Sequence, residues 1–217
     1  MLKVIEVRHQ VAIAGRVIDA GTQKPLGGAE IEIAEMPPAL KSALATKSMQ
    51  YGSRWDAMAE RPDRARTAAD GLFYFLDLPD GQYTVAASVA RLGRRYGVAQ
   101  CEAKVSRDAQ GKVKLAFKEI SLQATAVHGK VTGPGHEAGV VMAEIRVKGS
   151  GERAFSDESG KYVLAGIEPG RRINDEPGKR TIIVTAQGYR VATKRVTIEH
   201  PGQLATLDFP LARETAS

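Results

Sequence analysis

The residue types that most often carry chemistry are dispersed along this chain of 217 residues. Its histidines form neither an HExxH motif nor another metal-ligand spacing with the single cysteine, Cys101. Gly149-Ser150-Gly151 is typical of a turn between strands, because a nucleophile elbow requires Gly-x-Ser-x-Gly. We therefore expect a non-enzymatic protein without catalytic, cofactor-binding or metal-binding residues. The dispersed histidines are His9, His128, His136 and His200.

Acidic residues gather near several expected turns and could in principle hold calcium. They do not follow the order of an EF-hand or of another calcium loop, so a turn-forming role is the better interpretation. These residues are Asp70, Asp77, Asp80, Asp157 and Glu158.

A helical segment is predicted within residues 35–66, where apolar residues recur at steps of four, seven, four and three. Pro37 and Pro38 suit its start, Arg61-Pro62 suits its end, and Gly52 can divide it into two shorter helices. Two interpretations stay open: the stripe covers an edge or face of the neighbouring sheet, or its aromatic residues dock a partner protein. We take the stripe as the candidate partner-binding site: Leu40, Leu44, Tyr51, Trp55 and Met58.

The rest of the chain alternates as β-strands do, and its pattern repeats. Asp70-Gly71 and Ser159-Gly160 are turn signals that precede alternating strands. Gly71 to Leu78 and Gly160 to Ile167 are both seven residues apart, and Gly15–Ala29 and Gly129–Ala143 are both fourteen apart. The sequence therefore predicts an all-β chain of two tandem antiparallel β-sandwiches with a helical insertion in the first. The expected domains are 1–125, with the insertion at 35–66, and 126–212, followed by a flexible tail at 213–217.

Each copy combines Gly-x-Val, an Ala-Glu-Ile strand, Asp/Ser-Gly followed by an aromatic strand, and a Pro-Gly-type turn. This combination resembles the carboxypeptidase regulatory-like domain, which implies a transthyretin-like, seven-stranded β-sandwich without catalytic activity. The narrower stretch KSMQYGSRWDAMAERPDRARTAADGLFYFLDLPDGQYTV is similar to small carboxypeptidase-regulatory-like proteins that accompany phage-tail-like contractile injection systems. That resemblance implies an accessory part of a large protein assembly.

Charge and composition narrow the possible partners. The formal net charge is +6, but the basic residues are dispersed, whereas a nucleic-acid footprint needs a dense stripe with stacking aromatics. No run is long enough to span a membrane, and the N-terminus lacks the apolar core of a signal peptide. The single Cys101 cannot form an internal disulfide, which favours a reducing compartment. We therefore expect a cytoplasmic protein with protein partners.

The leading hypothesis is a non-enzymatic structural or interaction protein, an accessory component of a phage-tail-like contractile assembly. The alternative is a free-standing carbohydrate- or peptide-binding module that uses the loops at residues 91–96 and 171–180. These loops offer few exposed aromatics beyond Tyr96, so the alternative ranks lower. A hydrolase of transthyretin-like fold ranks lower still, because no cluster of His and Arg residues is apparent.

Overall fold

The computed structural model describes residues 9–58, 61–135, 139–173 and 176–214. The chain is mostly β-strand, which confirms the predicted all-β class, and the described residues contain one α-helix, α1 (Pro38–Tyr51). It divides into two compact units. Unit 1 comprises Met1–Ala90 and Val98–Leu122, and unit 2 comprises Arg91–Gly97 and Gln123–Ser217. No helix among the described residues has the length and apolar character needed to cross a membrane.

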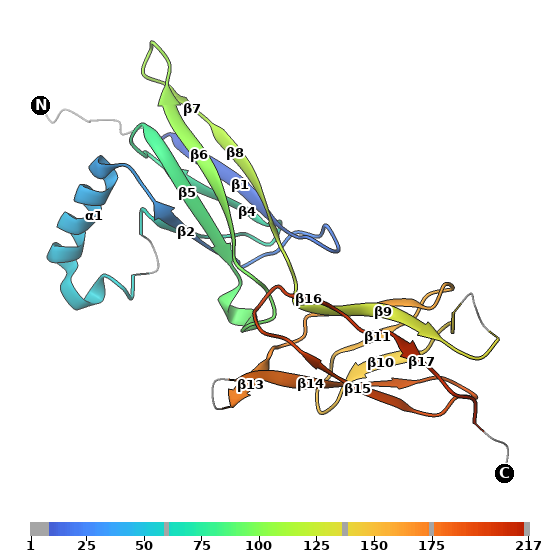
Figure 1. Ribbon diagram of the computed structural model, residues 1–217. Helices are drawn as coiled ribbons and strands as arrows, with labels where there is room; N and C mark the ends of the chain where they lie inside the picture. Colours follow the sequence, from blue (N-terminus) through green and yellow to red (C-terminus); the bar gives the residue numbers. More distant parts are fainter. Residues whose placement is uncertain (1–8, 59–60, 136–138, 174–175, 215–217) are drawn as a thin grey trace, which may run out of the picture. The chain divides into compact units, whose positions relative to one another are not determined.

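Unit 1 consists of two sheets that share a core (Figure 1). The three-stranded sheet has the order β4-β1-β8 and the five-stranded sheet the order β3-β2-β5-β6-β7. In both sheets alternate side chains are buried, as in Phe73 and Phe75 of β4 and Ile31 and Ile33 of β2, so the inner faces form a sandwich core. The strands are β1 (Val11–Asp19), β2 (Glu30–Glu35), β3 (Arg64–Arg66), β4 (Leu72–Leu76), β5 (Gly81–Ser88), β6 (Ala99–Arg107), β7 (Val113–Lys114) and β8 (Ala116–Leu122).

Unit 2 has a corresponding pair of sheets. One pairs β12, β9 and β16, with β17 also on β9, and the other has the order β11-β10-β14-β13, with β15 also on β14. Both contribute to one hydrophobic cluster that includes Val131, Ile145, Leu164, Val184 and Phe209. The strands are β9 (Ala126–Thr132), β10 (Glu144–Val147), β11 (Arg153–Phe155), β12 (Lys161–Ala165), β13 (Gly170–Ile173), β14 (Glu176–Thr185), β15 (Ala192–Thr197), β16 (Leu204–Thr206) and β17 (Phe209–Pro210).

The repeated glycine turns in the sequence correspond to the same backbone hydrogen bond in each unit. Val17 N–H donates to the Gly71 carbonyl at 2.9 Å, and Val131 N–H donates to the Gly160 carbonyl at 2.8 Å. Both glycines have positive φ, 79° and 76°. A Cβ atom would lie 2.5 Å from the Val17 carbonyl oxygen or 2.4 Å from that of Val131, so each turn needs glycine.

A buried hydroxyl group occupies the same place in both units. Thr67 Oγ1 accepts a hydrogen bond from Ala29 N–H at 2.8 Å and donates to the Leu26 carbonyl at 2.6 Å. Ser156 Oγ accepts from Ala143 N–H at 2.9 Å and donates to the Val140 carbonyl at 2.7 Å. Each hydroxyl therefore satisfies one backbone N–H group and one backbone carbonyl group. It does so at the point where the chain leaves one sheet of the unit and continues to the next strand in the other sheet.

The insertion and the chain ends differ in detail from the sequence-based expectation. The helix ends at Tyr51 because Gly52 adopts φ 54°, and a 3₁₀ turn, η1 (Gly52–Arg54), follows in place of a second α-helix. The last three residues of the expected insertion form β3, which pairs with β2. The predicted tail at 213–217 begins with paired residues, since Glu214 N–H donates to the Gly188 carbonyl at 3.0 Å, and residues 215–217 lie outside the described range.

Removing either buried hydroxyl should destabilise the unit that contains it. Thr67→Val and Ser156→Ala each leave a buried N–H and a carbonyl unpaired, so we expect each to lower the free energy of unfolding by about 1–3 kcal/mol. Urea denaturation measures the change. Ser121→Ala, at an exposed position of β8, is the control and should change stability by less than about 0.5 kcal/mol. Equal effects from all three variants would contradict the structural role of the hydroxyls.

Candidate functional site

The structure separates the five residues of the candidate partner-binding stripe. Leu40, Leu44 and Trp55 are buried, with exposed fractions of 6%, 9% and 7%. Tyr51 is 42% exposed, and Met58 is partly buried. Three of the five side chains are therefore packed inside unit 1, as in the interpretation that the stripe adds core.

Trp55 is held by a cluster formed within the insertion. The Tyr51 ring stacks on it at a centroid distance of 6.2 Å, and the Arg61 guanidinium lies 4.5 Å from its ring centroid. Arg61 also donates two hydrogen bonds to Asp63, from Nε at 2.9 Å and from a terminal nitrogen at 2.6 Å. The bond to Asp63 raises the pKa of Arg61, and Asp63 in turn accepts Ile33 N–H through its carbonyl at 2.9 Å.

This cluster agrees with the interpretation that the stripe covers the sheet, and the docking role of Trp55 stays a prediction. Its indole is enclosed by Tyr51 and Arg61, so it cannot contact a partner unless the cluster opens. Asp63 joins the cluster to β2 through Ile33. Trp55 therefore attaches the end of the insertion to the five-stranded sheet.

Trp55→Ala should consequently affect folding before it affects binding. The lost packing is expected to lower the stability of the insertion by about 3 kcal/mol. Hydrogen exchange should then accelerate in residues 38–58, and Trp55→Phe should restore much of the protection. A Trp55→Ala variant with unchanged exchange and weaker partner binding would instead support direct docking.

A groove lies next to this cluster on the outer face of the five-stranded sheet, with a volume of about 750 Å³. Strand register explains its shape, because residues directly opposite one another share a face. One row across the sheet is Arg66, Glu30 and Ser88, and the next is Arg64, Glu32 and Ala86. The remaining lining residues are Ile31, Met58, Ala65, Ala87 and Val98.

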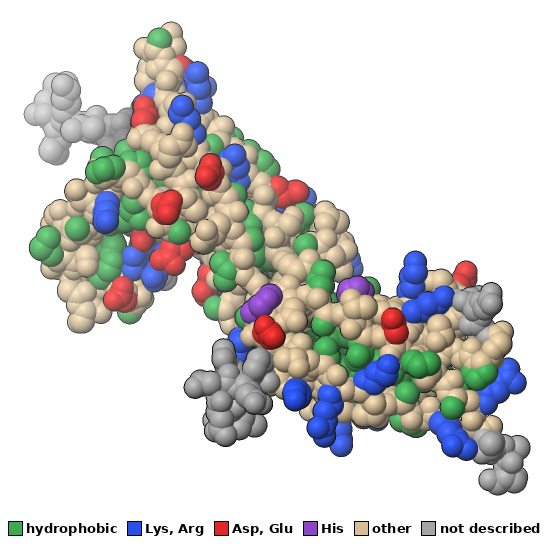
Figure 2. Space-filling model, viewed as in Figure 1, with side chains coloured by type: hydrophobic (Ala, Val, Ile, Leu, Met, Phe, Trp, Pro, Cys, Tyr) green, Lys and Arg blue, Asp and Glu red, His purple; other side chains and the backbone are tan. Residues whose placement is uncertain are grey.

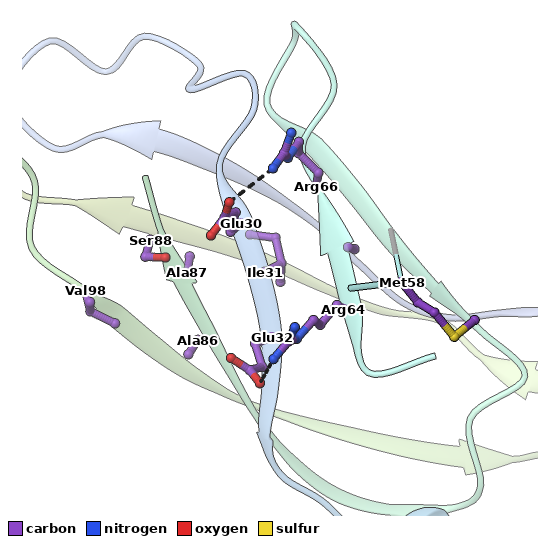
Figure 3. A pocket seen from close by; sticks show the side chains of 11 residues that line it. Glu30, Ile31, Glu32, Met58, Arg64, Arg66, Ala86, Ala87, Ser88 and Val98 are labelled. Carbon is purple, nitrogen blue, oxygen red and sulfur yellow. Dashed lines mark hydrogen bonds and ion pairs between the residues drawn. The ribbon is translucent and has the colours of Figure 1, made fainter. Parts of the chain in front are cut away.

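One wall of the groove consists of two cross-strand ion pairs (Figure 3). Arg66 and Glu30 approach to 3.1 Å, and Arg64 and Glu32 to 3.5 Å. Acidic and basic side chains accordingly lie side by side between α1 and the sheet (Figure 2). All four side chains are at least 40% exposed, so the pairs contribute little to stability and remain accessible to a ligand.

Small side chains on β5 leave the floor of the groove uncovered. Ala86 lies opposite Glu32, and Ser88 lies opposite Glu30. In unit 2 the positions with the same register on β14 are Ile183, opposite Arg146, and Thr185, opposite Glu144. The second unit thus shows that a larger β-branched residue can occupy the place of Ala86 in the same type of sheet.

The sequence predicted part of this site. Its Ala-Glu-Ile strand corresponds to β2, but it missed Arg64 and Arg66, which lay inside the expected insertion. The alternation of Arg64, Ala65 and Arg66 opposite Glu-Ile-Glu was the signal that could have indicated a paired strand.

The acidic turn residues do not converge on one site. Asp70 Oδ1 accepts Leu72 N–H at 3.0 Å, and Asp157 Oδ1 accepts the N–H groups of Ser159 and Lys161 at 2.9 and 2.8 Å. The Ser159 hydroxyl, which donates to the same oxygen, lowers the pKa of Asp157. These bonds support the turn-forming interpretation. Within the described ranges, no three His, Cys, Asp or Glu side chains are placed to hold a metal ion.

No protein-family model and no curated protein sequence matches the chain. Among solved structures, it is similar to the shaft pilin SpaA from Lactobacillus rhamnosus GG, with 13% identity, a TM-score of 0.43, and coverage of 97% of this chain and 100% of that one. It is also similar to GBS52, the minor pilin of Streptococcus agalactiae, with 14% identity, a TM-score of 0.29, and coverage of 94% and 97%. The Bacillus anthracis TIE protein matches 94% of this chain at 16% identity and a TM-score of 0.35, but the match spans only 34% of that protein. Similarities at this level carry no functional conclusion.

Proposed function

We propose that this chain is a non-enzymatic protein-interaction module whose groove holds an extended segment of a partner protein. The observation that carries the proposal is the groove on the outer face of β3, β2 and β5, with small residues as its floor and exposed charged side chains as its wall. Ligands bind preferentially in concave sites with apolar surface and a few polar groups, because such sites bury a large part of the ligand's surface.

The spacing of the groove suits an extended polypeptide. Ala86 and Ser88 lie two residues apart on β5, so the floor repeats every ~7 Å, as do alternate side chains of an extended segment. The wall offers both charge signs, since Glu30 and Glu32 face Arg66 and Arg64. A bound segment that carries one acidic and one basic side chain can pair its acidic group with an arginine of the wall and its basic group with a glutamate. No charged group is then left unpaired.

The finer proposal concerns the assembly that contains this partner. The repeated motifs support two tandem carboxypeptidase regulatory-like, transthyretin-like sandwiches, and residues 47–85 resemble proteins that accompany phage-tail-like contractile injection systems. Sedimentation of native host lysate tests the placement. Recovery in a large particle together with sheath or tube proteins is the expected result, and a slowly sedimenting species alone would contradict it.

Ala86→Ile should block the groove and leave the fold intact, because unit 2 carries isoleucine at the position of the same register. With a photo-crosslinking residue at the exposed Val98 position, the wild-type chain is expected to label one partner in host cells. Ala86→Ile should reduce that labelling at least about tenfold, since a filled floor prevents the segment from seating.

Gln82→Ile is the matched control for this experiment. It adds the same side chain to the outer face of β5, outside the groove. Equal labelling by wild type, Gln82→Ile and Ala86→Ile, with unchanged urea midpoints, would exclude the groove as the binding site.

A further inference from the structure

A second surface of unit 1, on the opposite sheet, remains unexplained by the groove. The outer face of β4-β1-β8 carries large apolar side chains, of which Tyr74 and Phe117 are 61% and 57% exposed. Tyr74 and Phe117 lie on either side of Ala14 in register, so the three form one row across the sheet. We call this surface the β4 face: Val11, Leu72, Tyr74, Leu76 and Phe117.

The corresponding edge strand of unit 2, β12, carries a charged residue that opposes pairing with another chain. On β12, Lys161, Val163 and Ala165 point outward, in the pattern of Leu72, Tyr74 and Leu76 on β4. Lys161 lies opposite Lys130 of β9. A lysine on an edge strand discourages pairing with other chains, and β4 carries no charged residue at all.

The hydrogen-bonding edge of β4 is open on the side away from β1. Within the described residues β4 pairs only with β1. The Gly71 carbonyl and Asp77 N–H both bond toward β1, at 2.9 Å each, so the odd-numbered residues face that strand. Tyr74 therefore directs its N–H and C=O toward the open edge. The N–H and C=O of Leu72 also point toward the open edge, but both already have partners in the local turn. The N–H donates to Asp70 Oδ1, and the carbonyl accepts from Ala68 N–H.

The sequence of β4 is the same in both directions, Leu-Phe-Tyr-Phe-Leu. Antiparallel pairing of two such strands about Tyr74 places tyrosine opposite tyrosine and Leu72 opposite Leu76 of the other copy. The two Tyr74 residues can then exchange both bonds of a closely spaced pair.

We propose that the open edge of β4 is the contact between two copies of this chain, joined by antiparallel β4 strands about a two-fold axis at Tyr74. The interface is isologous, so it closes at a dimer. It brings Tyr74 beside Tyr74, and Leu72 beside Leu76, of the other copy, so these exposed apolar side chains gain contact across the paired strands. It lies on the sheet opposite the groove, and its test is independent of the proposed partner.

Disulfide cross-linking in the full chain tests the register, with Cys101→Ser as background. Tyr74→Cys should form a covalent dimer on mild oxidation, because paired Cα atoms lie ~5.5 Å apart, within disulfide range. Leu72→Cys alone should not, since its two copies lie ~14 Å apart along the strands. An equimolar mixture of Leu72→Cys and Leu76→Cys chains should cross-link again. A dimer with any other pattern would overturn the β4 register.

Sedimentation equilibrium tests the dimer itself. Leu72→Lys, which copies the residue of unit 2, should weaken dimerisation at least about tenfold, because two lysines would face apolar side chains. Val163→Lys, at an exposed position of β12, is the control and should leave the dissociation constant unchanged. A wild-type chain that remains monomeric at the highest accessible concentration, and no Tyr74→Cys cross-link, would overturn the proposal.

Discussion

The structure of unit 1 depends on the two hydrogen bonds of the Thr67 hydroxyl. Thr67 is the residue at which the chain leaves β3 and turns toward β4. Its hydroxyl joins this point to Ala29, which directly precedes β2, and to Leu26, four residues before the start of β2. This connection holds the chain at the point where it passes from β3, beside β2 at the wall of the groove, to β4 in the opposite sheet. Ser156 makes the same connection in unit 2, so the constraint belongs to the repeated unit rather than to the insertion.

Local patterns predicted the parts of the fold that depend on neighbouring residues. The alternating aromatic strand expected after Asp70-Gly71 is β4, in which Phe73 and Phe75 face inward and are buried at 3% exposure each. The equal glycine spacings predicted a repeat, because Gly71 and Gly160 both occupy a turn in which a Cβ atom would meet a carbonyl oxygen. Such signals are readable from sequence since their physical cause lies within a few residues.

Features that depend on distant residues were missed or misread. β3 is three residues long and is a strand through its antiparallel backbone pairing with β2, which lies about 30 residues earlier in the chain. The grouping of Arg91–Gly97 with unit 2 arises from contacts such as the Thr125 N–H bond to the Arg95 carbonyl at 2.7 Å, which no local pattern indicates. Trp55 has helical spacing, but its burial depends on Arg61, which approaches it from beyond the end of α1. The outward residues of β4 have no local signal of their own, because alternation shows which side chains share a face and not what covers that face.

Unit 2 serves as an internal reference for both surfaces of unit 1. It buries a comparable core with the same hydroxyl connection and the same glycine turn, yet it has Ile183 in place of Ala86 and Lys161 in place of Leu72. In unit 2, Arg153 faces Arg146 where unit 1 has the Arg64–Glu32 ion pair. The stability of this kind of sandwich therefore requires neither an open floor, nor an ion-paired wall, nor an uncharged edge. Because packing does not demand these three features in unit 1, they are free to serve the two contacts proposed above, a partner segment in the groove and a second copy at the edge of β4.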